Sequence, residues 1–400
     1  MSASSAAVGL PRLRRIGFIV TLGLVTAIPP FAVDTYIPAF PAMRDGLGVS
    51  EVGIQLTLTA FLIGIGVGQL VIGSLSDAYG RRQFILWGTV GFILFSILCA
   101  IAPVLPMLIA GRFAQGVCGA AGMVLARSVV YDVVDVASLP RYFGALSAIL
   151  GVVPVIAPLI GAVLLEWTSW RGLFVFMAVM GVVMFVTLYR FVPESLPPER
   201  RSTAGLGNML TAMRGLLLDR QFCCFLLSNS LATAAILSYI GGTPFVMESE
   251  FGTTDSAYAI GFSITALALV TATTVFMRLS RRFSPARMLV GGLITASTGC
   301  LLVLGQSIGQ VPNEFGIWAA FAVFMAGMGF ILPSTLTGGQ LAGGAGSAGA
   351  ASALLGGVPF LFSAAAAPVA GLLGDTLVAV AGACLALVLI ASSTLLLLRR

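Results

Sequence analysis

GSLSDAYGRR, residues 73–82, is a short polar turn between two long apolar runs. Its glycines, Gly73 and Gly80, permit close helix contact and a tight turn, because glycine has no Cβ. Its charged side chains can form a network and face the ends of neighbouring helices; they are Asp77, Arg81 and Arg82. The turn is therefore predicted to join two membrane-spanning helices on one side of a bilayer.

The composition around this turn is that of a membrane protein. Of 400 residues, 58% are hydrophobic and 9% are charged, and the mean hydropathy is +1.05, whereas a soluble chain carries about 25% charged residues. Runs of about 20 apolar residues can each cross the bilayer as a helix. No stretch has the alternating pattern, about 10 residues long, of a membrane-barrel strand. The sequence therefore predicts an all-α integral membrane protein.

Twelve such runs are predicted to be transmembrane helices. The basic stretch before the first run is short, and no small-residue cleavage site follows a short apolar core, so we expect a retained helix rather than a signal peptide. The runs lie near residues 16–40, 53–75, 84–102, 107–129, 143–165, 171–191, 222–246, 257–279, 288–306, 315–336, 348–373 and 376–398.

The arginines predict the orientation of these helices. All 21 basic residues are Arg, and with both termini in the cytoplasm nearly all of them fall on the cytoplasmic side, as the positive-inside rule requires. Only Arg44 and Arg171 would face outward, and Arg112 lies within a span. The net charge of +6 therefore reports topology, and no nucleic-acid partner is expected.

The longest polar interruption, residues 192–221, predicts the division of the chain. It separates an N-terminal six-helix half, residues 1–191, from a C-terminal six-helix half, residues 222–400. Its proline and charge content is typical of a cytoplasmic linker. Within it, NMLTAMRGLLL (208–218) is expected to form a short helix on the membrane surface.

Asp34 and Arg112 are the charged side chains expected deep in the membrane. Each lies six or seven residues inside the outer boundary of its span, or roughly 10 Å deep at about 1.5 Å per residue. A carboxylate in hydrocarbon is costly and is by default a functional group. Arg112 would lower the proton affinity of Asp34 and burial would raise it, so we expect Asp34 to change protonation near neutral pH. The alternative is a permanent ion pair that only fixes helix packing.

Further side chains are candidates for lining a substrate cavity. Aromatic rings and a flexible thioether suit promiscuous recognition of apolar drugs. Ordinary packing is the alternative for each of them, because such residues are common in any membrane bundle. The candidates are Tyr36, Gln55, Thr59, Gln115, Asn229, Tyr239, Met325 and Phe330.

Three motifs carry a family resemblance. The 73–82 turn matches the G-x-L-x-D-x-x-G-R-R/K signature of the major facilitator superfamily at every fixed place. Residues 108–116, LIAGRFAQG, are similar to the R-x-x-Q-G pattern of its proton-coupled members. Residues 151–162, GVVPVIAPLIGA, resemble the antiporter motif built around G-P-x-x-G-G, although Ala replaces Gly at 157 and 162. The resemblance implies a major facilitator fold of twelve transmembrane helices in two six-helix halves, built from inverted repeats around a central site.

The third motif predicts how one helix packs. Pro158 lacks a backbone donor and, with Gly151 and Gly161, should bend this helix and allow tight packing against a helix of the other half. Ordinary small-residue packing is the alternative.

Other segments narrow the resemblance to the bicyclomycin-resistance and chloramphenicol/florfenicol-efflux (Bcr/CflA) subfamily of drug:proton antiporters. They are DTYIPAFPAM (34–43), ARSVVYD (126–132), SYIGGTPFVMESEFG (238–252) and AGAASALLG (348–356). The chain departs at Thr26, where some exporters of this type carry a second acid. The resemblance implies a multi-pass antiporter of the bacterial inner membrane that exports small amphipathic antimicrobials, of the bicyclomycin or chloramphenicol/florfenicol type, in exchange for protons.

An uptake symporter or facilitator for a small nutrient on the same fold is the alternative function. The sequence has no histidine, no metal-ligand cluster, no G-x-S-x-G and no phosphate-binding loop. We therefore expect no enzymatic activity, no metal and no cofactor, with a proton gradient as the energy source. The protein is expected to act as a monomer.

Overall fold

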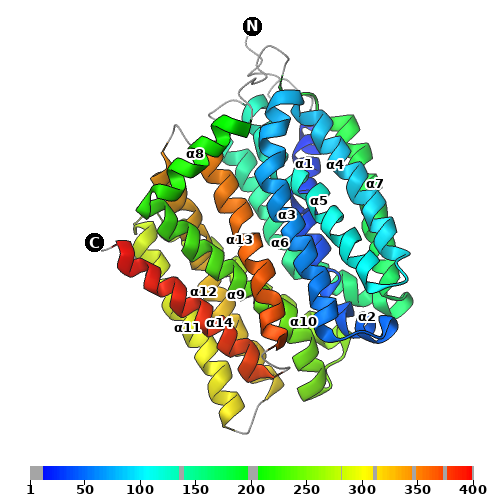
Figure 1. The fold of residues 1–400 in the computed structure, drawn as a ribbon, viewed down its shortest axis with the longest axis vertical. Helices are drawn as coiled ribbons and strands as arrows, with labels where there is room; N and C mark the ends of the chain where they lie inside the picture. The colour runs from blue at the N-terminus through cyan, green and yellow to red at the C-terminus, as the bar shows by residue number, and fades with distance from the viewer. Residues whose placement is uncertain are drawn as a thin grey trace.

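The fold is all-helical throughout the part of the chain that the computed structural model describes (Figure 1). The described residues are 12–134, 139–196, 206–280, 282–309, 313–344, 348–372 and 376–398. Within them, eleven helices are long and apolar enough to cross a membrane. The predicted all-α membrane fold is therefore confirmed.

Each of the twelve predicted spans corresponds to one long helix. Those of the N-terminal half are α1 (Arg12–Asp34), α3 (Glu51–Tyr79), α4 (Arg81–Ala100), α5 (Leu105–Val133), α6 (Leu139–Trp167) and α7 (Trp170–Phe191). Those of the C-terminal half are α9 (Arg220–Phe251), α10 (Asp255–Leu279), α11 (Pro285–Ile308), α12 (Glu314–Gly343), α13 (Ala348–Leu372) and α14 (Leu377–Leu398). The three short elements are η2 (Ile37–Ala39), α2 (Phe40–Leu47) and α8 (Leu206–Leu218).

The first predicted span lies within the apolar stretch Arg15–Leu47, but it is not one continuous helix. It was expected to continue to residue 40, but α1 ends at Asp34, and the 3₁₀ turn η2 and the separate helix α2 follow it. Pro38 lies in the first turn of η2 and Pro41 in that of α2, and neither has a backbone N–H with which to continue the hydrogen bonds of the preceding helix. Asp34 is therefore the last residue of α1, at the point where the helix ends and the chain turns.

The long helices connect two ends of the bundle, which we call the α2 end and the α8 end after the short helices there (Figure 1). Arg44 and Arg171, the two arginines predicted to face outward, lie at the α2 end. The α8 end is thus the predicted cytoplasmic side.

The predicted short helix of the linker is confirmed as α8. It is not isolated on the surface, because Met213 and Leu216 pack against Phe222 of α9 and Leu354 of α13. Residues 197–205 of the linker lie outside the described residues. The boundaries proposed for the two halves stay predictions.

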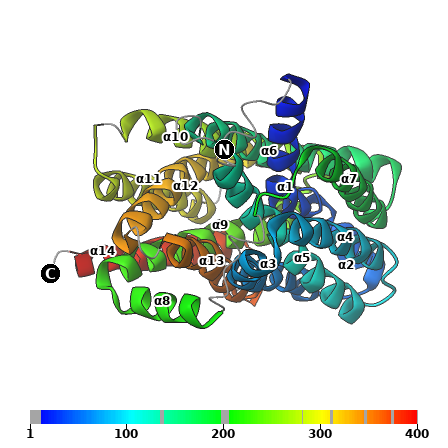
Figure 2. The same cartoon turned by 90° about the horizontal axis from the view of Figure 1, so that it is seen from above.

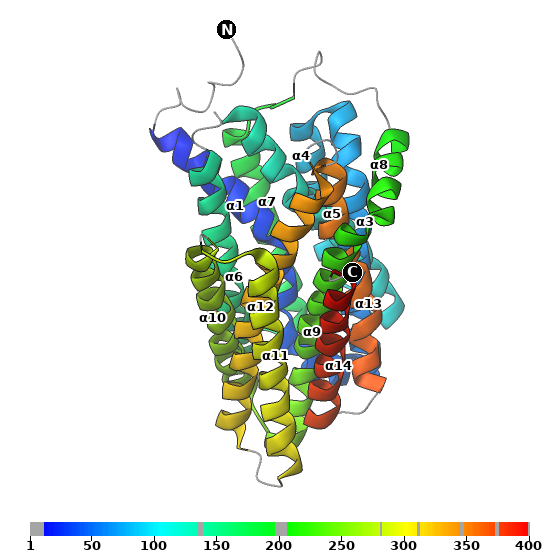
Figure 3. The ribbon, with the colours of Figure 1, turned by 90° about the vertical axis from the view of Figure 1, so that its left-hand side faces the viewer.

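The two halves pack against each other through two helix pairs. Figures 2 and 3 show α13 beside α3 and α10 beside α6. Four polar contacts join the halves in the described residues: Arg44 to Glu248 (3.3 Å), Gln55 to the Gly241 carbonyl (3.4 Å), Ser256 to Glu166 (3.0 Å) and Ser263 to the Val155 carbonyl (2.7 Å). All four lie between the middle of the bundle and the α2 end, so the structure is closed at that end.

Candidate functional site

The predicted turn at 73–82 is confined to Gly80, because residues 73–79 continue α3 and Arg81 begins α4. Gly80 links α3 to α4 with a φ of 108°, a backbone conformation that favours glycine. Arg81 forms an ion pair with Asp132 at the end of α5, with 2.7 Å between Nε and Oδ2. Arg82 donates to the carbonyl oxygens of Tyr189 (3.0 Å) and Val192 (2.8 Å) at the end of α7. The side chain of Asp77 lies outside the described part.

Two further acids, Asp132 and Glu194, bind residues of this turn. The sequence analysis did not identify either of them as a site residue. Glu194 Oε1 accepts from the backbone N–H groups of Arg81 (3.1 Å) and Arg82 (3.4 Å) at the N-terminus of α4, where a negative charge is favourable. Asp132 also accepts from Ser195 Oγ at 3.0 Å. The signal for Asp132 was its place at the end of the quoted ARSVVYD segment. The turn therefore connects α5, α7 and the first residues of the linker.

The expected pairing of Asp34 with Arg112 is not formed. Both side chains are buried, at 5% and 0% exposure, but within the described ranges no ion pair joins them. Arg112 instead donates to Gln115 Oε1 (2.6 Å) and to the Ala32 carbonyl (3.4 Å). The Ala32 carbonyl belongs to the last turn of α1, so Arg112 compensates the negative end of that helix.

Aromatic rings surround the Arg112 guanidinium. Its carbon lies 4.2 Å from the ring centre of Tyr36, 4.0 Å from that of Phe61 and 5.7 Å from that of Phe174. Ring faces attract a cation, and more strongly where water is excluded. The rings, Gln115 and the helix end thus hold the charge of Arg112 without a carboxylate.

The segment that follows Asp34 contacts the other half of the protein. Asp34 and Ala32 are two residues apart, which is about 200° around a helix, so a side chain at 34 points away from the carbonyl that Arg112 binds. The turn η2 begins three residues after Asp34 and contacts both α9 and α10. The carboxyl group therefore lies beside the contact of η2 with the C-terminal helices.

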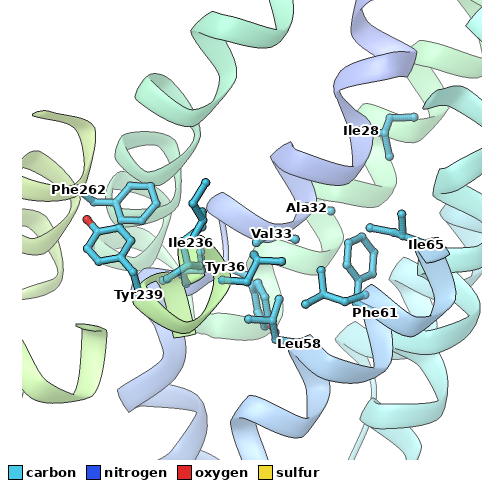
Figure 4. Packing of buried hydrophobic residues seen from close by; sticks show 14 of the residues in the cluster. Ile28, Ala32, Val33, Tyr36, Leu58, Phe61, Ile65, Ile236, Tyr239 and Phe262 are labelled. Atoms are coloured by element: carbon cyan, nitrogen blue, oxygen red, sulfur yellow. The ribbon is translucent and has the colours of Figure 1, made fainter. Parts of the chain in front are cut away.

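Tyr239 is the centre of an aromatic cluster. Its ring centre lies 5.9 Å from that of Phe262, 4.8 Å from that of Phe321 and 6.0 Å from that of Phe324, and its hydroxyl bonds Thr265 Oγ1 at 2.8 Å. Figure 4 shows Tyr239 and Phe262 in one cluster with residues of α1 and α3.

Only Tyr239 of this aromatic cluster was among the sequence candidates. Tyr258 also belongs to it, through Phe262 (6.0 Å) and Trp318 (5.6 Å). The other aromatic residues could have been found by their helical spacing, because residues three or four apart lie on the same face of a helix. Tyr258 is four residues before Phe262, and Phe321 is three residues before Phe324.

Three further candidates lie beside Arg112 or between the halves. Tyr36 bonds Thr57 Oγ1 at 3.0 Å, and Gln115 donates to Ser96 Oγ at 2.7 Å. Gln55 reaches the Gly241 carbonyl of α9. These hydrogen bonds join helices, and the cavity-lining role of the three residues stays a prediction.

The other candidates are dispersed. Thr59 of α3 and Met325 of α12 are both buried in the bundle. Asn229 donates to the Leu355 carbonyl and accepts from Thr335 Oγ1, both at 3.0 Å, so its amide joins α9, α12 and α13. Phe330 lines an outer groove between α10 and α12, so the structure does not bring it to Tyr239.

The glycines of the third motif have different partners from those expected. A Cβ on Gly161 would overlap the Thr35 carbonyl of its own half, directly after Asp34, so the prediction that Gly161 packs on the other half is wrong. Gly151 does face the other half, because a Cβ added there would lie 3.6 Å from Val270 Cγ1. Ten residues of helix turn through about 1,000°, which places the two glycines on different faces. Pro158 is buried within α6, which continues unbroken.

Comparison with known proteins places the chain in a family. Residues 22–358 match the model of the Major Facilitator Superfamily. The chain is 32% identical over 360 residues to an uncharacterized MFS-type transporter, YdgK, of Bacillus subtilis (90% of this chain, 89% of the relative). It is 29% identical over 373 residues to multidrug resistance protein D of Escherichia coli (92% and 91%) and 25% identical over 350 residues to the bicyclomycin resistance protein homolog of Haemophilus influenzae (87% and 87%).

Solved structures agree on the fold. The crystal structure of a D-xylose-proton symporter matches with a TM-score of 0.75 and 14% identity, over 94% of this chain and 97% of that chain. The relatives named for multidrug and bicyclomycin resistance confirm the resemblance to the Bcr/CflA subfamily. The chain belongs to the major facilitator superfamily of membrane transporters.

Proposed function

We propose that this transporter is a proton-coupled efflux antiporter for small amphipathic antimicrobials, and that Asp34 carries the coupled proton. One observation supports this most directly: the Asp34 carboxyl is buried at the end of α1, directly before the segment that contacts α9 and α10 of the other half, and no described cation pairs with it. An unpaired carboxylate in apolar surroundings is costly, and taking up a proton removes that cost.

The position of Asp34 supports coupling to movement. The carboxyl belongs to the N-terminal half and lies beside the contact of η2 with α9 and α10 of the C-terminal half, so a change in the relative position of the halves changes the surroundings of the carboxyl. A state that brings water to Asp34 favours its charged form, and a state that buries it favours the protonated form. Proton binding and conformation then influence each other reciprocally.

The substrate class is inferred from the cluster around Tyr239 and from the names of the relatives. The rings of Tyr239, Phe262 and Phe321 form a buried aromatic surface inside the C-terminal half. Such a surface suits compounds with an apolar ring system and a polar group. The relatives named for multidrug and bicyclomycin resistance support export of antimicrobials.

We also propose a location, an oligomeric state and an energy source for this transporter. We place the protein in the bacterial inner membrane as a monomer, with both termini and the α8 end in the cytoplasm. It acts as a transporter without enzymatic activity, metal or cofactor, and the proton gradient supplies the energy.

The test is drug-induced proton release from the purified protein in weakly buffered detergent. Asp34→Asn should abolish release and drug accumulation against a gradient, while Asp45→Asn, which changes an exposed acid of the same half, should behave as wild type. Undiminished release from the Asp34 variant would exclude it as the proton carrier. Proton entry together with the substrate, rather than in exchange for it, would favour the uptake symporter.

A further inference from the structure

The groove between α10 and α12 has the shape and lining of a binding site for an acyl chain. It has a volume of about 450 Å³. All its side chains are apolar except that of Thr271. From α10 come Ile264, Leu267, Ala268, Thr271, Ala272 and Val275, and from α12 come Ala322, Ala326 and Phe330.

This groove opens to the outside of the bundle. Ile264 and Leu267 are exposed, while Phe262 and Thr265 of the same helix contact Tyr239 in the interior. Figure 2 shows α10 at the edge of the bundle. In a membrane, the groove therefore faces the lipid.

The length of the groove matches one leaflet. From Ile264 to Val275 the helix rises about 16 Å at about 1.5 Å per residue, and half of a hydrocarbon core of about 30 Å is about 15 Å. Ile264 lies near the middle of α10 and Val275 near its α8 end. The groove thus extends from the bilayer centre to the headgroups of the leaflet at the α8 end.

An arginine stands at the headgroup end of the groove. Arg278 is one turn beyond Val275 on the same exposed face of α10, and no ion pair to Arg278 is found in the described residues. Arg282, four residues further along the chain, is also exposed. A guanidinium group binds phosphate through paired hydrogen bonds, and neighbouring positive charges favour a lipid with net negative charge.

We propose that this groove and Arg278 form a binding site for an anionic phospholipid of the leaflet at the α8 end. One acyl chain lies along Ile264, Thr271 and Val275, and the phosphate binds Arg278. The inference is independent of the drug and of the coupled ion.

The site can be tested by native mass spectrometry of the purified full-length protein with phosphatidylglycerol and phosphatidylcholine of identical acyl chains. We expect preferential retention of phosphatidylglycerol. Arg278→Gln should weaken its binding about 5-fold, the equivalent of one basic residue near an anionic membrane, and leave phosphatidylcholine unchanged. Thr271→Trp, which fills the groove from an exposed position, should weaken both lipids.

Matched variants separate this site from general lipid contact. Arg287→Gln removes an exposed arginine at the start of α11, and Leu301→Trp adds bulk at an exposed position of α11 outside the groove. Both should bind lipid as wild type does. Equal retention of the two lipids by the wild type, or equal losses from Arg278→Gln and Arg287→Gln, would overturn the proposal, because either result describes lipid bound without a specific site.

Discussion

The ion pair between Arg44 and Glu248 joins the halves at the α2 end, and removing it should shift the balance between conformations. Arg44 also binds Asp45 (2.8 Å) and Glu51 (3.1 Å) of its own half. Glu248→Gln therefore removes the charge attraction across the halves and leaves Arg44 with two acidic partners. The state in which the α2 end is open should become more populated.

The expected shift is modest. The two side chains are 25% and 38% exposed and 3.3 Å apart, which is the range of partly solvated ion pairs worth about 0.2–1 kcal/mol. That energy corresponds to an increase of about 1.4- to 5-fold in the ratio of open to closed α2 ends. The contact of Phe40 with Phe245, with 5.7 Å between ring centres, remains and limits the effect.

Distance measurements between spin labels can detect this shift. Ile101 and Phe315 are exposed at the α2 end on opposite halves, and labels there require replacement of the six native cysteines. Glu51→Gln is the matched control, because it removes a partner of Arg44 within one half. High salt should reduce the difference between wild type and Glu248→Gln, since about 1 M salt screens charges beyond about 3 Å. Unchanged distance distributions in Glu248→Gln, or the same shift in Glu51→Gln, would refute the reasoning.

Three other substitutions test further contacts. Gly161→Ala should lower the free energy of unfolding by about 1–3 kcal/mol through overpacking and impair transport, because the added Cβ meets the Thr35 carbonyl. Gly151→Ala has room for the added Cβ and should be tolerated. Equal tolerance of the two substitutions would contradict the contact at Gly161. Asp132→Asn, which weakens the contact with Arg81, should slow transport in proteoliposomes with unchanged equilibrium drug binding; a loss of binding in a folded variant would contradict it. Asn229→Ala should cost about 1–2 kcal/mol in thermal unfolding with unchanged substrate preference; a changed preference would instead make Asn229 a substrate residue.

The sequence was sufficient for the fold because its signals are local. Apolar runs, the Gly80 turn and the linker helix each depend on a few neighbouring residues, and the structure has them where they were expected. The break after Asp34 was missed because the run stays apolar through it. Pro38 and Pro41 mark the break, but the hydrophobic pattern does not register them.

The site was harder to predict because it depends on the direction in which each side chain leaves its helix, and the sequence analysis used only the depth of each residue in the membrane. Asp34 and Arg112 are both deeply buried, yet the helix carries Asp34 away from Arg112. For the same reason Phe330 was predicted to line the cavity, although it lines the outer groove. Phe321, which contacts Tyr239, was not predicted. A helical-face comparison separates these two: nine residues turn through about 900°, which places them on opposite sides of α12.

α6 connects the region of Asp34 to the other half of the protein. Its Gly161 packs on the Thr35 carbonyl, directly after Asp34, and its Val155 carbonyl accepts a hydrogen bond from Ser263 of α10 at 2.7 Å. If Asp34 carries the coupled proton as proposed, its protonation changes the charge beside this junction. The close backbone contact at Gly161 leaves little space for the segment after Asp34 to move independently of α6. We infer that α6 transmits changes at Asp34 to α10. This inference requires that Gly161→Ala impair proton-coupled transport more than drug binding, whereas Gly151→Ala, on another face of the same helix, should alter neither.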